Sequence, residues 1–230
     1  MIMGRPADIE RITSEALADA AEANGVTQLV ELEGRLGNLL HADTEAHSAL
    51  RDAVKTHASM DLLLNHATQQ AVTGLAHNDI PVLILKGTAL AHLHYPEPYL
   101  RTRCDTDLYI RKDDRHAVAR VMEGMGYGIT GFDTRRNSSR QFGAGRVSAA
   151  GAPVQFDIHW KLSNRVLFAD TLLFEEAWRD RQSIPALGKD AWAPCDADLL
   201  YHACIHRIAH GRGTERNRLI WLYDIHLLWN

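Results

Sequence analysis

Two short segments that alternate between apolar and polar residues constrain this chain more than any other feature. Residues 104–110 (CDTDLYI) place Asp105 and Asp107 on the same side of an extended chain, because successive side chains of a strand point to opposite faces. Residues 154–160 (VQFDIHW) place Asp157 on the polar side in the same way. The opposite faces are apolar, so we expect two buried strands whose polar faces carry three carboxylates.

The rest of the chain divides into helical and strand-rich parts. Residues 7–77 contain no proline, are rich in Ala, Leu and Glu, and carry apolar residues at helical spacing. Helical spacing returns from Asp196 onward. We therefore expect an α+β fold with a helical N-terminal region at residues 1–78, a core at residues 79–195 and a helical C-terminal region at residues 196–230.

Local patterns predict the shorter elements. We expect a long helix from about residue 43 toward Gly74, a strand at residues 81–86, a helix at residues 113–125 and a strand at residues 127–130. Residues 131–150 are rich in glycine, serine and arginine, which indicates a basic hairpin or loop.

The composition excludes several classes of protein. The 230 residues carry 25 Lys and Arg against 29 Asp and Glu, so the chain lacks the overall basic field that non-specific nucleic-acid binding needs. Three cysteines without a C-x-x-C pair indicate neither a disulfide framework nor a cysteine zinc site. No apolar stretch approaches a membrane span of about 18 residues, and no signal peptide is evident, so we expect a cytoplasmic protein with no membrane partner. The oligomeric state is left open.

The three aspartates are a set of ligands suited to a hard divalent cation. Asp105 and Asp107 point the same way on a strand and can hold one cation or a close pair. Asp157 completes the site if the two strands are neighbours. Oxygen ligands without cysteine suit Mg²⁺, or Mn²⁺ in its place, and such a site serves phosphoryl or nucleotidyl transfer.

A phosphate-binding element is expected just upstream, at Lys86, Gly87 and Thr88. A strand ends there, the glycine lets the backbone approach a ligand, and a helix N-terminus offers free amide groups. Lys86 adds a positive charge and Thr88 adds a hydroxyl. Arg101 and Arg103 either bind phosphate or pair with the acidic residues, and the sequence leaves both roles open.

Taken in order, these motifs resemble the polymerase-beta type nucleotidyltransferase superfamily and, more narrowly, the family of uncharacterised nucleotidyltransferases. The resemblance covers roughly residues 50–229 and rests on segments that include LKGTAL (85–90), DTDLYI (105–110), DIHW (157–160) and LIWLYDI (219–225). It implies a small mixed β-sheet with helices and Mg²⁺ bound by Asp105 and Asp107. It also implies that Asp157 completes the catalytic site and activates an acceptor hydroxyl, and that Gly87 and Thr88 hold a triphosphate.

This chain departs from the family pattern in three ways. Gly87 and Asp105 are 18 positions apart, which is longer than in minimal members of the superfamily, and Thr88 replaces the usual serine. Many relatives continue beyond the last motif, so part of an acceptor-binding region could be absent.

The resemblance predicts an Mg²⁺-dependent enzyme that transfers a nucleoside monophosphate from a nucleoside triphosphate (NTP) to a hydroxyl-bearing acceptor. RNA, a protein and a small molecule are all open as acceptors, and the base of the NTP is undetermined. The alternative is a non-catalytic nucleotide-binding or partner module.

Histidines raise a further, less favoured alternative. His202, His206 and His210 recur at every fourth position, near one face of a helix, as in a histidine-site metal hydrolase. No His-Glu-x-x-His motif is present, so we predict that His202 and His206 line a nucleotide pocket, support the carboxylates or pack in the core. His159 shares the polar face of Asp157 and is predicted to support it. Asp224 and His226 are predicted to be a packing and capping pair.

Overall fold

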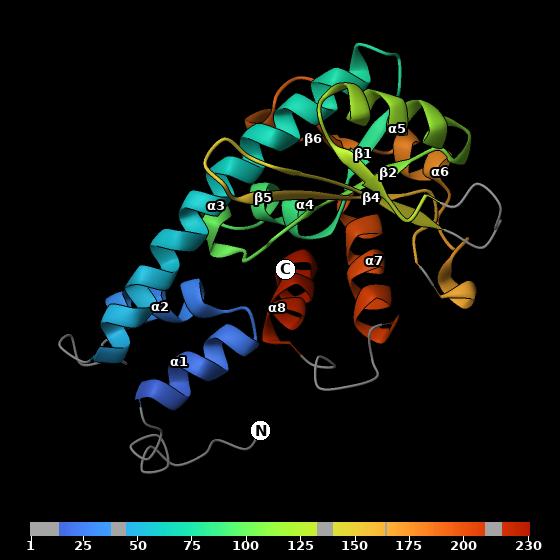
Figure 1. The fold of residues 1–230 in the computed structure, drawn as a ribbon. Helices are drawn as coiled ribbons and strands as arrows, with labels where there is room; N and C mark the ends of the chain where they lie inside the picture. Colours follow the sequence, from blue (N-terminus) through green and yellow to red (C-terminus); the bar gives the residue numbers. More distant parts are fainter. Residues whose placement is uncertain (1–13, 38–44, 133–139, 164, 210–217) are drawn as a thin grey trace.

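The structure is a computed structural model that describes residues 14–37, 45–132, 140–163, 165–209 and 218–230. In these residues eight α-helices accompany a five-stranded mixed sheet and a separate two-stranded ladder (Figure 1). The expected α+β class with a small mixed sheet is confirmed.

Three helices precede the sheet: α1 (Ser14–Ala23), α2 (Thr27–Gly37) and α3 (Glu45–Ala76). The last of these is the predicted long helix. Three more lie among the strands: α4 (Lys86–Leu93), α5 (Arg115–Gly124) and α6 (Phe174–Arg179). Helices α7 (Asp196–Ala209) and α8 (Leu219–Trp229) come last. Short 3₁₀ turns occupy Pro98–Leu100, Lys112–Asp114, Val166–Phe168 and Pro185–Leu187.

The main sheet has the strand order β1-β2-β5-β4-β3. Its strands are β1 (Val82–Ile84), β2 (Thr106–Ile110), β3 (Gly128–Thr130), β4 (Gln141–Val147) and β5 (Pro153–His159). The small ladder pairs β6 (Gln182–Ser183) with β7 (Trp192–Ala193). Strands β2 and β5 are parallel, and the other neighbours are antiparallel. The two acidic strands are therefore neighbours, as the site prediction requires.

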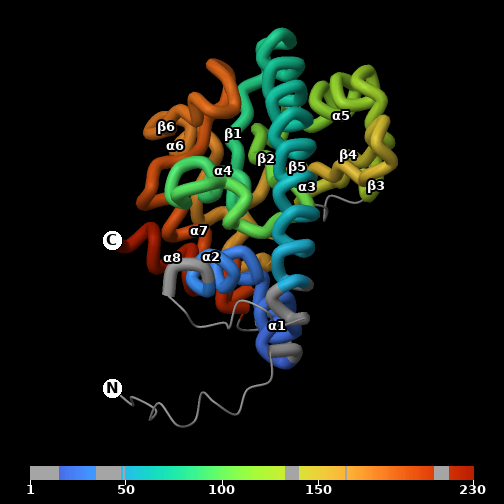
Figure 2. The backbone as a smooth tube through the Cα atoms, turned by 90° about the vertical axis from the view of Figure 1, so that its left-hand side faces the viewer, coloured from blue at the N-terminus to red at the C-terminus, as the bar shows by residue number. Residues whose placement is uncertain are grey.

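Alternation along β2 and β5 fills two cores on opposite faces of the sheet. Leu108 and Phe156 belong to the larger core, which includes buried residues of α3 and α5. Tyr109 belongs to the smaller core, together with Leu83 and Ile205 of α7. Helices α3 and α5 lie on one side of the sheet and α7 and α8 on the other (Figures 1 and 2). Asp107 shares the face of Tyr109, so its carboxylate lies on the α7 side.

Helix α8 is held in place by the N-terminal part of the chain. The backbone N–H of Ile220 donates to the carbonyl oxygen of Asn24 at 3.2 Å, and that of Leu219 donates to the Asn24 side chain at 3.3 Å. Thr102 donates to the carbonyl oxygen of Gly25 at 3.0 Å. The turn between α1 and α2 therefore contacts both α8 and the segment that leads into β2.

Of the two alternatives expected for residues 131–150, a hairpin or a loop, the structure shows the hairpin, because β4 pairs antiparallel with β3 on one side and with β5 on the other. Residues 141–147 form β4, which pairs along its whole length with β5, and residues 133–139 lie outside the described residues. The glycines that suggest a loop have a packing role. A Cβ at Gly143 would lie 2.7 Å from the Thr130 hydroxyl, and one at Gly145 would lie 2.5 Å from the Gln155 amide oxygen. A side chain at either position would therefore require the side chain of Thr130 or Gln155 to move.

Other expectations shift by a few residues. Strand β2 begins at Thr106, so Asp105 lies in a bend just before it, and Lys86 begins α4 rather than ending β1.

No helix within the described ranges combines the length and the apolar character needed to cross a membrane. The three cysteines are free.

Candidate functional site

The site is built on the parallel pair β2 and β5. Asp107 lies directly opposite Asp157 in the register of these strands. Residues that are directly opposite in neighbouring strands point to the same face of a sheet, so both carboxylates face the same cavity. Asp107 is buried, with 7% of its surface exposed, and Asp157 is half-buried.

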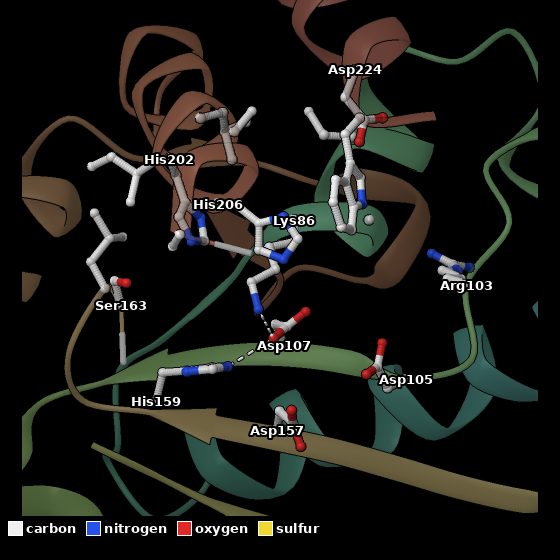
Figure 3. Close-up of a pocket in the computed structure, with 18 of the residues that line it drawn as sticks. Lys86, Arg103, Asp105, Asp107, Asp157, His159, Ser163, His202, His206 and Asp224 are labelled. Atoms are coloured by element: carbon white, nitrogen blue, oxygen red, sulfur yellow. Dashed lines mark hydrogen bonds and ion pairs between the residues drawn. The ribbon is translucent and has the colours of Figure 1, made fainter. Parts of the chain in front are cut away.

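His159 brings an imidazole to the same place. It follows Asp157 by two positions on β5, and its Nε2 lies 2.7 Å from Oδ1 of Asp107 (Figure 3). One ligand atom from each of Asp107, Asp157 and His159 lies within 4.8 Å of the other two. Among the described residues, these three form the group that could hold a metal ion. The two carboxylates are oxygen ligands of the kind that Mg²⁺ and Mn²⁺ prefer, and the imidazole is hydrogen-bonded to one of them.

Lys86 supplies the positive charge of the site. Its Nζ lies 2.5 Å from Oδ1 of Asp107, as the dashed line in Figure 3 marks. Burial favours a higher pKa for the Asp107 carboxyl, but the Lys86 ammonium and the hydrogen bond with His159 outweigh burial and hold that pKa well below its usual range. Asp107 is therefore a carboxylate at any physiological pH.

Asp105 lies at the entry to β2 and lines the same cavity. Burial, together with the negative charges of Asp107 and Asp157, raises the pKa of its carboxyl to about 6. The three predicted aspartates therefore repel one another across this end of the cavity. Such repulsion is what a bound cation relieves.

Gly87 lies beside an ion pair between Arg101 and Asp224, a pairing that the sequence does not predict. Arg101 donates from Nε to Oδ1 of Asp224 at 2.8 Å and from Nη2 to Oδ2 at 2.7 Å, and the hydroxyl of Tyr95 donates to Oδ1 at 2.8 Å. A Cβ on Gly87 would lie 3.5 Å from Nη1 of Arg101. Arg101 thus pairs with α8 rather than with the acidic cluster, and it lies beside the predicted phosphate-binding element at the start of α4. Asp224 is thus buried in the packing of α8, and His226 contacts Asn230 at the end of that helix.

Arg103 has a different partner from Arg101. Its Nη2 donates to the side chains of Asp61 and Asn65 on α3, while Nε and Nη1 are buried without a hydrogen-bond partner among the described residues.

Thr88 differs from the other predicted phosphate ligands. Its side chain is 2% exposed, and its hydroxyl lies 3.2 Å from the hydroxyl of Thr106, on the core side of α4.

These groups open onto a cavity of about 590 Å³, a size typical of small-molecule sites. Lys86, Gly87, Arg101, Arg103 and the three aspartates all line it. His202 and His206 of α7 line it too, as does Trp221 of α8. The structure therefore gathers most of the predicted site residues around one cavity, with Thr88 as the exception.

His202 is buried, and its burial lowers the pKa of the imidazole to about 3, with the positive charge of Lys86 as the next cause. It is neutral at physiological pH. The rings of His202 and His206 pack edge to face with their centroids 6.4 Å apart. Neither belongs to the metal-binding cluster found in the described residues, and His210 lies outside them. The geometry thus favours the role of pocket lining over a histidine metal site.

The sequence does not predict that Asp224 and Trp221 line the cavity or that Asp61 pairs with Arg103. A signal existed for Asp224, because it is the single acidic residue within the apolar segment LIWLYDI of a helix. An acid in such a position is seldom buried without a partner. Nothing in the local sequence of α3 indicates that Asp61 reaches Arg103, since this contact depends on the packing of α3 against the segment before β2.

The sequence and fold were compared with those of known proteins. The sequence model of a family described as uncharacterised nucleotidyltransferases matches residues 10–230. A search of curated proteins gives no match.

Three solved structures match parts of the chain at low sequence identity. The antibiotic-resistance factor ANT(2'')-Ia matches with a TM-score of 0.47 and 11% identity, over 73% of this chain and 83% of that one. An antigenic nucleotidyltransferase-like protein from Paracoccidioides brasiliensis matches with a TM-score of 0.46 and 13% identity, over 72% and 74%. A chain from the complex between the Type VI effector Tas1 and its immunity protein matches with a TM-score of 0.35 and 12% identity, over 76% and 94%.

Proposed function

The chain belongs to the family of uncharacterised nucleotidyltransferases, and from this premise we propose that it is an Mg²⁺-dependent enzyme. It transfers a nucleoside monophosphate from an NTP to a hydroxyl-bearing acceptor and releases pyrophosphate. Mn²⁺ can replace Mg²⁺, because both accept carboxylate oxygens. The acceptor class is to be found by experiment, with RNA, protein and small molecules as the candidates.

The observation that carries this proposal is the position of Asp107 opposite Asp157, on a face that opens into the same cavity as Lys86 and Gly87. Nucleotidyl transfer needs carboxylates that hold a cation and, within reach of them, groups that bind a triphosphate. Both kinds of group line this cavity.

The donor set supports a cation held by Asp107 and Asp157, with Asp105 beside them and His159 supporting Asp107 through its hydrogen bond. A bound cation supplies charge stabilisation for the phosphoryl oxygens during transfer. Burial, and after it the negative charges of Asp107 and Asp157, raises the pKa of Asp105 to about 6.

The protein's own side chains accept the proton and bind the triphosphate. Transfer forms a bond from the acceptor oxygen to the α-phosphorus and breaks the bond from that phosphorus to the pyrophosphate oxygen. Asp157, half-buried and facing the cavity, accepts the proton that the acceptor hydroxyl loses. Lys86, the backbone at Gly87 and the Arg101 guanidinium beside it all line this cavity and bind the triphosphate.

The test is to incubate the purified protein with each of the four α-labelled NTPs and Mg²⁺. Total RNA, a protein extract and a small-molecule extract serve as separate acceptors. Label should pass to one of the three acceptor classes, and the size of the product identifies which. Asp107→Asn keeps the shape of the side chain but removes its charge, and it should lower the transfer rate at least about a hundredfold.

Asp113→Asn is the matched control, because Asp113 is an exposed acid near the far end of β2 and should be replaceable without loss. Equal activity in the Asp107→Asn variant and the parent would overturn the assignment of the site. A parent that binds Mg²⁺-NTP in calorimetry but labels no acceptor would favour the non-catalytic binding module. A parent that binds no NTP would overturn the proposal altogether.

A further inference from the structure

We propose that Trp221 is a stacking surface for the nucleobase of the NTP. This inference rests on the proposed function and extends it, because it assigns a place in the cavity to the part of the substrate that takes no part in the chemistry. A nucleobase offers a flat π-face whatever its identity, and an aromatic side chain that lines a nucleotide cavity provides a matching surface.

The cavity has two chemically different walls. The end at strands β2 and β5 carries the three aspartates, with Lys86 at the start of α4 beside Asp107, and these groups suit a cation and phosphates. Helices α7 and α8 contribute Leu199, the imidazoles of His202 and His206, and the indole of Trp221. Among the described residues of these two helices, the one carboxylate that lines the cavity, that of Asp224, is paired with Arg101. A nucleotide has the same division, with a charged triphosphate at one end and a weakly polar ring system at the other. The orientation that matches both ends places the base toward the helices.

Neighbouring side chains hold the indole of Trp221 in place. Its ring meets the imidazole of His206 edge to face, with centroids 4.9 Å apart and planes at 89°. The Arg218 guanidinium lies over the same indole, 6.0 Å from the centroid. Trp221 is half-buried and packs against the main core, so part of the side chain is exposed to the cavity. A side chain held in this way loses little conformational entropy when a ligand binds.

Contacts described above also fix Trp221 relative to the phosphate end of the cavity. Trp221 and Asp224 are three positions apart on α8 and so lie on neighbouring parts of one helical face. Asp224 makes the two-point ion pair with Arg101, whose guanidinium lies against Gly87. A buried ion pair thus joins the helix that carries the stacking surface to Arg101, which lies beside the start of α4, where the triphosphate is proposed to bind.

Two ligands separate binding of the base from binding of the phosphates: an NTP, and inorganic triphosphate, which lacks the base and the sugar. Calorimetry in the presence of Mg²⁺ gives the affinity for each. Trp221→Ala should weaken NTP binding by about five- to a hundredfold and leave the affinity for inorganic triphosphate unchanged. Trp221→Phe keeps a π-face and should restore most of the NTP affinity.

Trp229→Ala is the matched control, because Trp229 lies on the same helix with 78% of its surface exposed and should affect neither ligand. Loss of both affinities in Trp221→Ala would mean that Trp221 only supports the fold, and loss of neither would place the base elsewhere. Either result overturns this inference while leaving the proposed function intact. A parent that binds neither ligand would overturn the proposed function itself and the inference with it.

Discussion

Arg101 and Asp224, which are 123 positions apart in the sequence, form a buried two-point ion pair with N···O distances of 2.8 and 2.7 Å. The hydroxyl of Tyr95 adds a third hydrogen bond to the same carboxylate. Burial disfavours the charged guanidinium, but Asp224 outweighs this and keeps the pKa of Arg101 above its ordinary value. The final helix is therefore tied to the segment that leads into the acidic strand.

Removal of one member of this pair should be costly. Asp224→Ala leaves the Arg101 guanidinium buried without a counter-charge, and we expect the free energy of unfolding to fall by about 3–5 kcal/mol. Urea denaturation measures the change. Glu175→Gln is the control, because the Arg111–Glu175 pair is exposed and should contribute less than about 1 kcal/mol. Similar losses in the two variants would contradict a special role for the buried pair.

Gly87→Ala should separate nucleotide binding from stability. The added methyl would lie 3.5 Å from the Arg101 guanidinium, which is an ordinary contact, so the free energy of unfolding should change by less than about 1 kcal/mol. The methyl would stand where the triphosphate must approach the backbone, and we expect KM for the NTP to rise at least about tenfold. Gly124→Ala, with open space around it, should leave KM unchanged. An unaltered KM in Gly87→Ala would show that the triphosphate does not approach this glycine.

Divalent cations should stabilise the folded protein. Asp105, Asp107 and Asp157 repel one another, and a cation bound only by the folded state removes that repulsion. At about a hundred times its dissociation constant, Mg²⁺ or Mn²⁺ should add about 2.7 kcal/mol to the free energy of unfolding, and a chelator should reverse the gain. Asp157→Asn should abolish most of it, while Asp113→Asn should not. Thermal unfolding with and without the cation checks this, and an equal gain in all three proteins would place the cation elsewhere.

His92 should make stability depend on pH. Burial, and then the positive charge of Arg103, lowers the pKa of its imidazole from 6.5 to about 4. Between these values the unfolded chain binds more protons than the folded one, so stability is full above pH 6.5 and falls as the pH drops toward 4. Since the side chain is only partly buried, we expect a loss of roughly 2 kcal/mol across this window.

The matched variant for this pH effect is His92→Gln. The imidazole Nε2 lies 2.9 Å from Oδ1 of Asn65, and a glutamine amide can donate to the same oxygen without titrating. Urea denaturation at neutral pH and near the lower end of the window should give a shallower pH dependence for the variant. Identical dependence in both proteins would assign the effect to other groups.

Much of the fold could be predicted because it is encoded locally. Alternation in residues 104–110 and 154–160 predicts β2 and β5, and helical spacing predicts α3, α7 and α8. The sequence left β4 open between a hairpin and a loop, because Gly143 and Gly145 are turn signals when read locally. A side chain at either glycine would meet the side chains of Thr130 or Gln155, which only the assembled sheet brings near.

For the site, too, some features are encoded locally and others depend on the tertiary structure. The positions of Asp107 and Asp157 on the polar faces of their strands follow from strand periodicity alone. Their placement opposite each other depends on the register of two strands fifty positions apart, which the sequence predicts only as a possibility. The partners of Arg101 and Arg103 lie on α8 and α3, 123 and 42 positions away, so the choice between phosphate contact and ion pair required the tertiary structure.

The register of Asp107 against Asp157 has a consequence for folding as well as for chemistry. If β5 slipped by one residue along β2, Asp157 would turn into the apolar core that Phe156 and Ile158 fill, and those two side chains would turn toward the cavity. A carboxylate buried without a partner costs several kcal/mol, so the misaligned sheet is strongly disfavoured. Replacing Asp157 by an apolar residue would remove this penalty. The acidic residues proposed to bind the cation thus also help to select one alignment of the sheet over its alternatives.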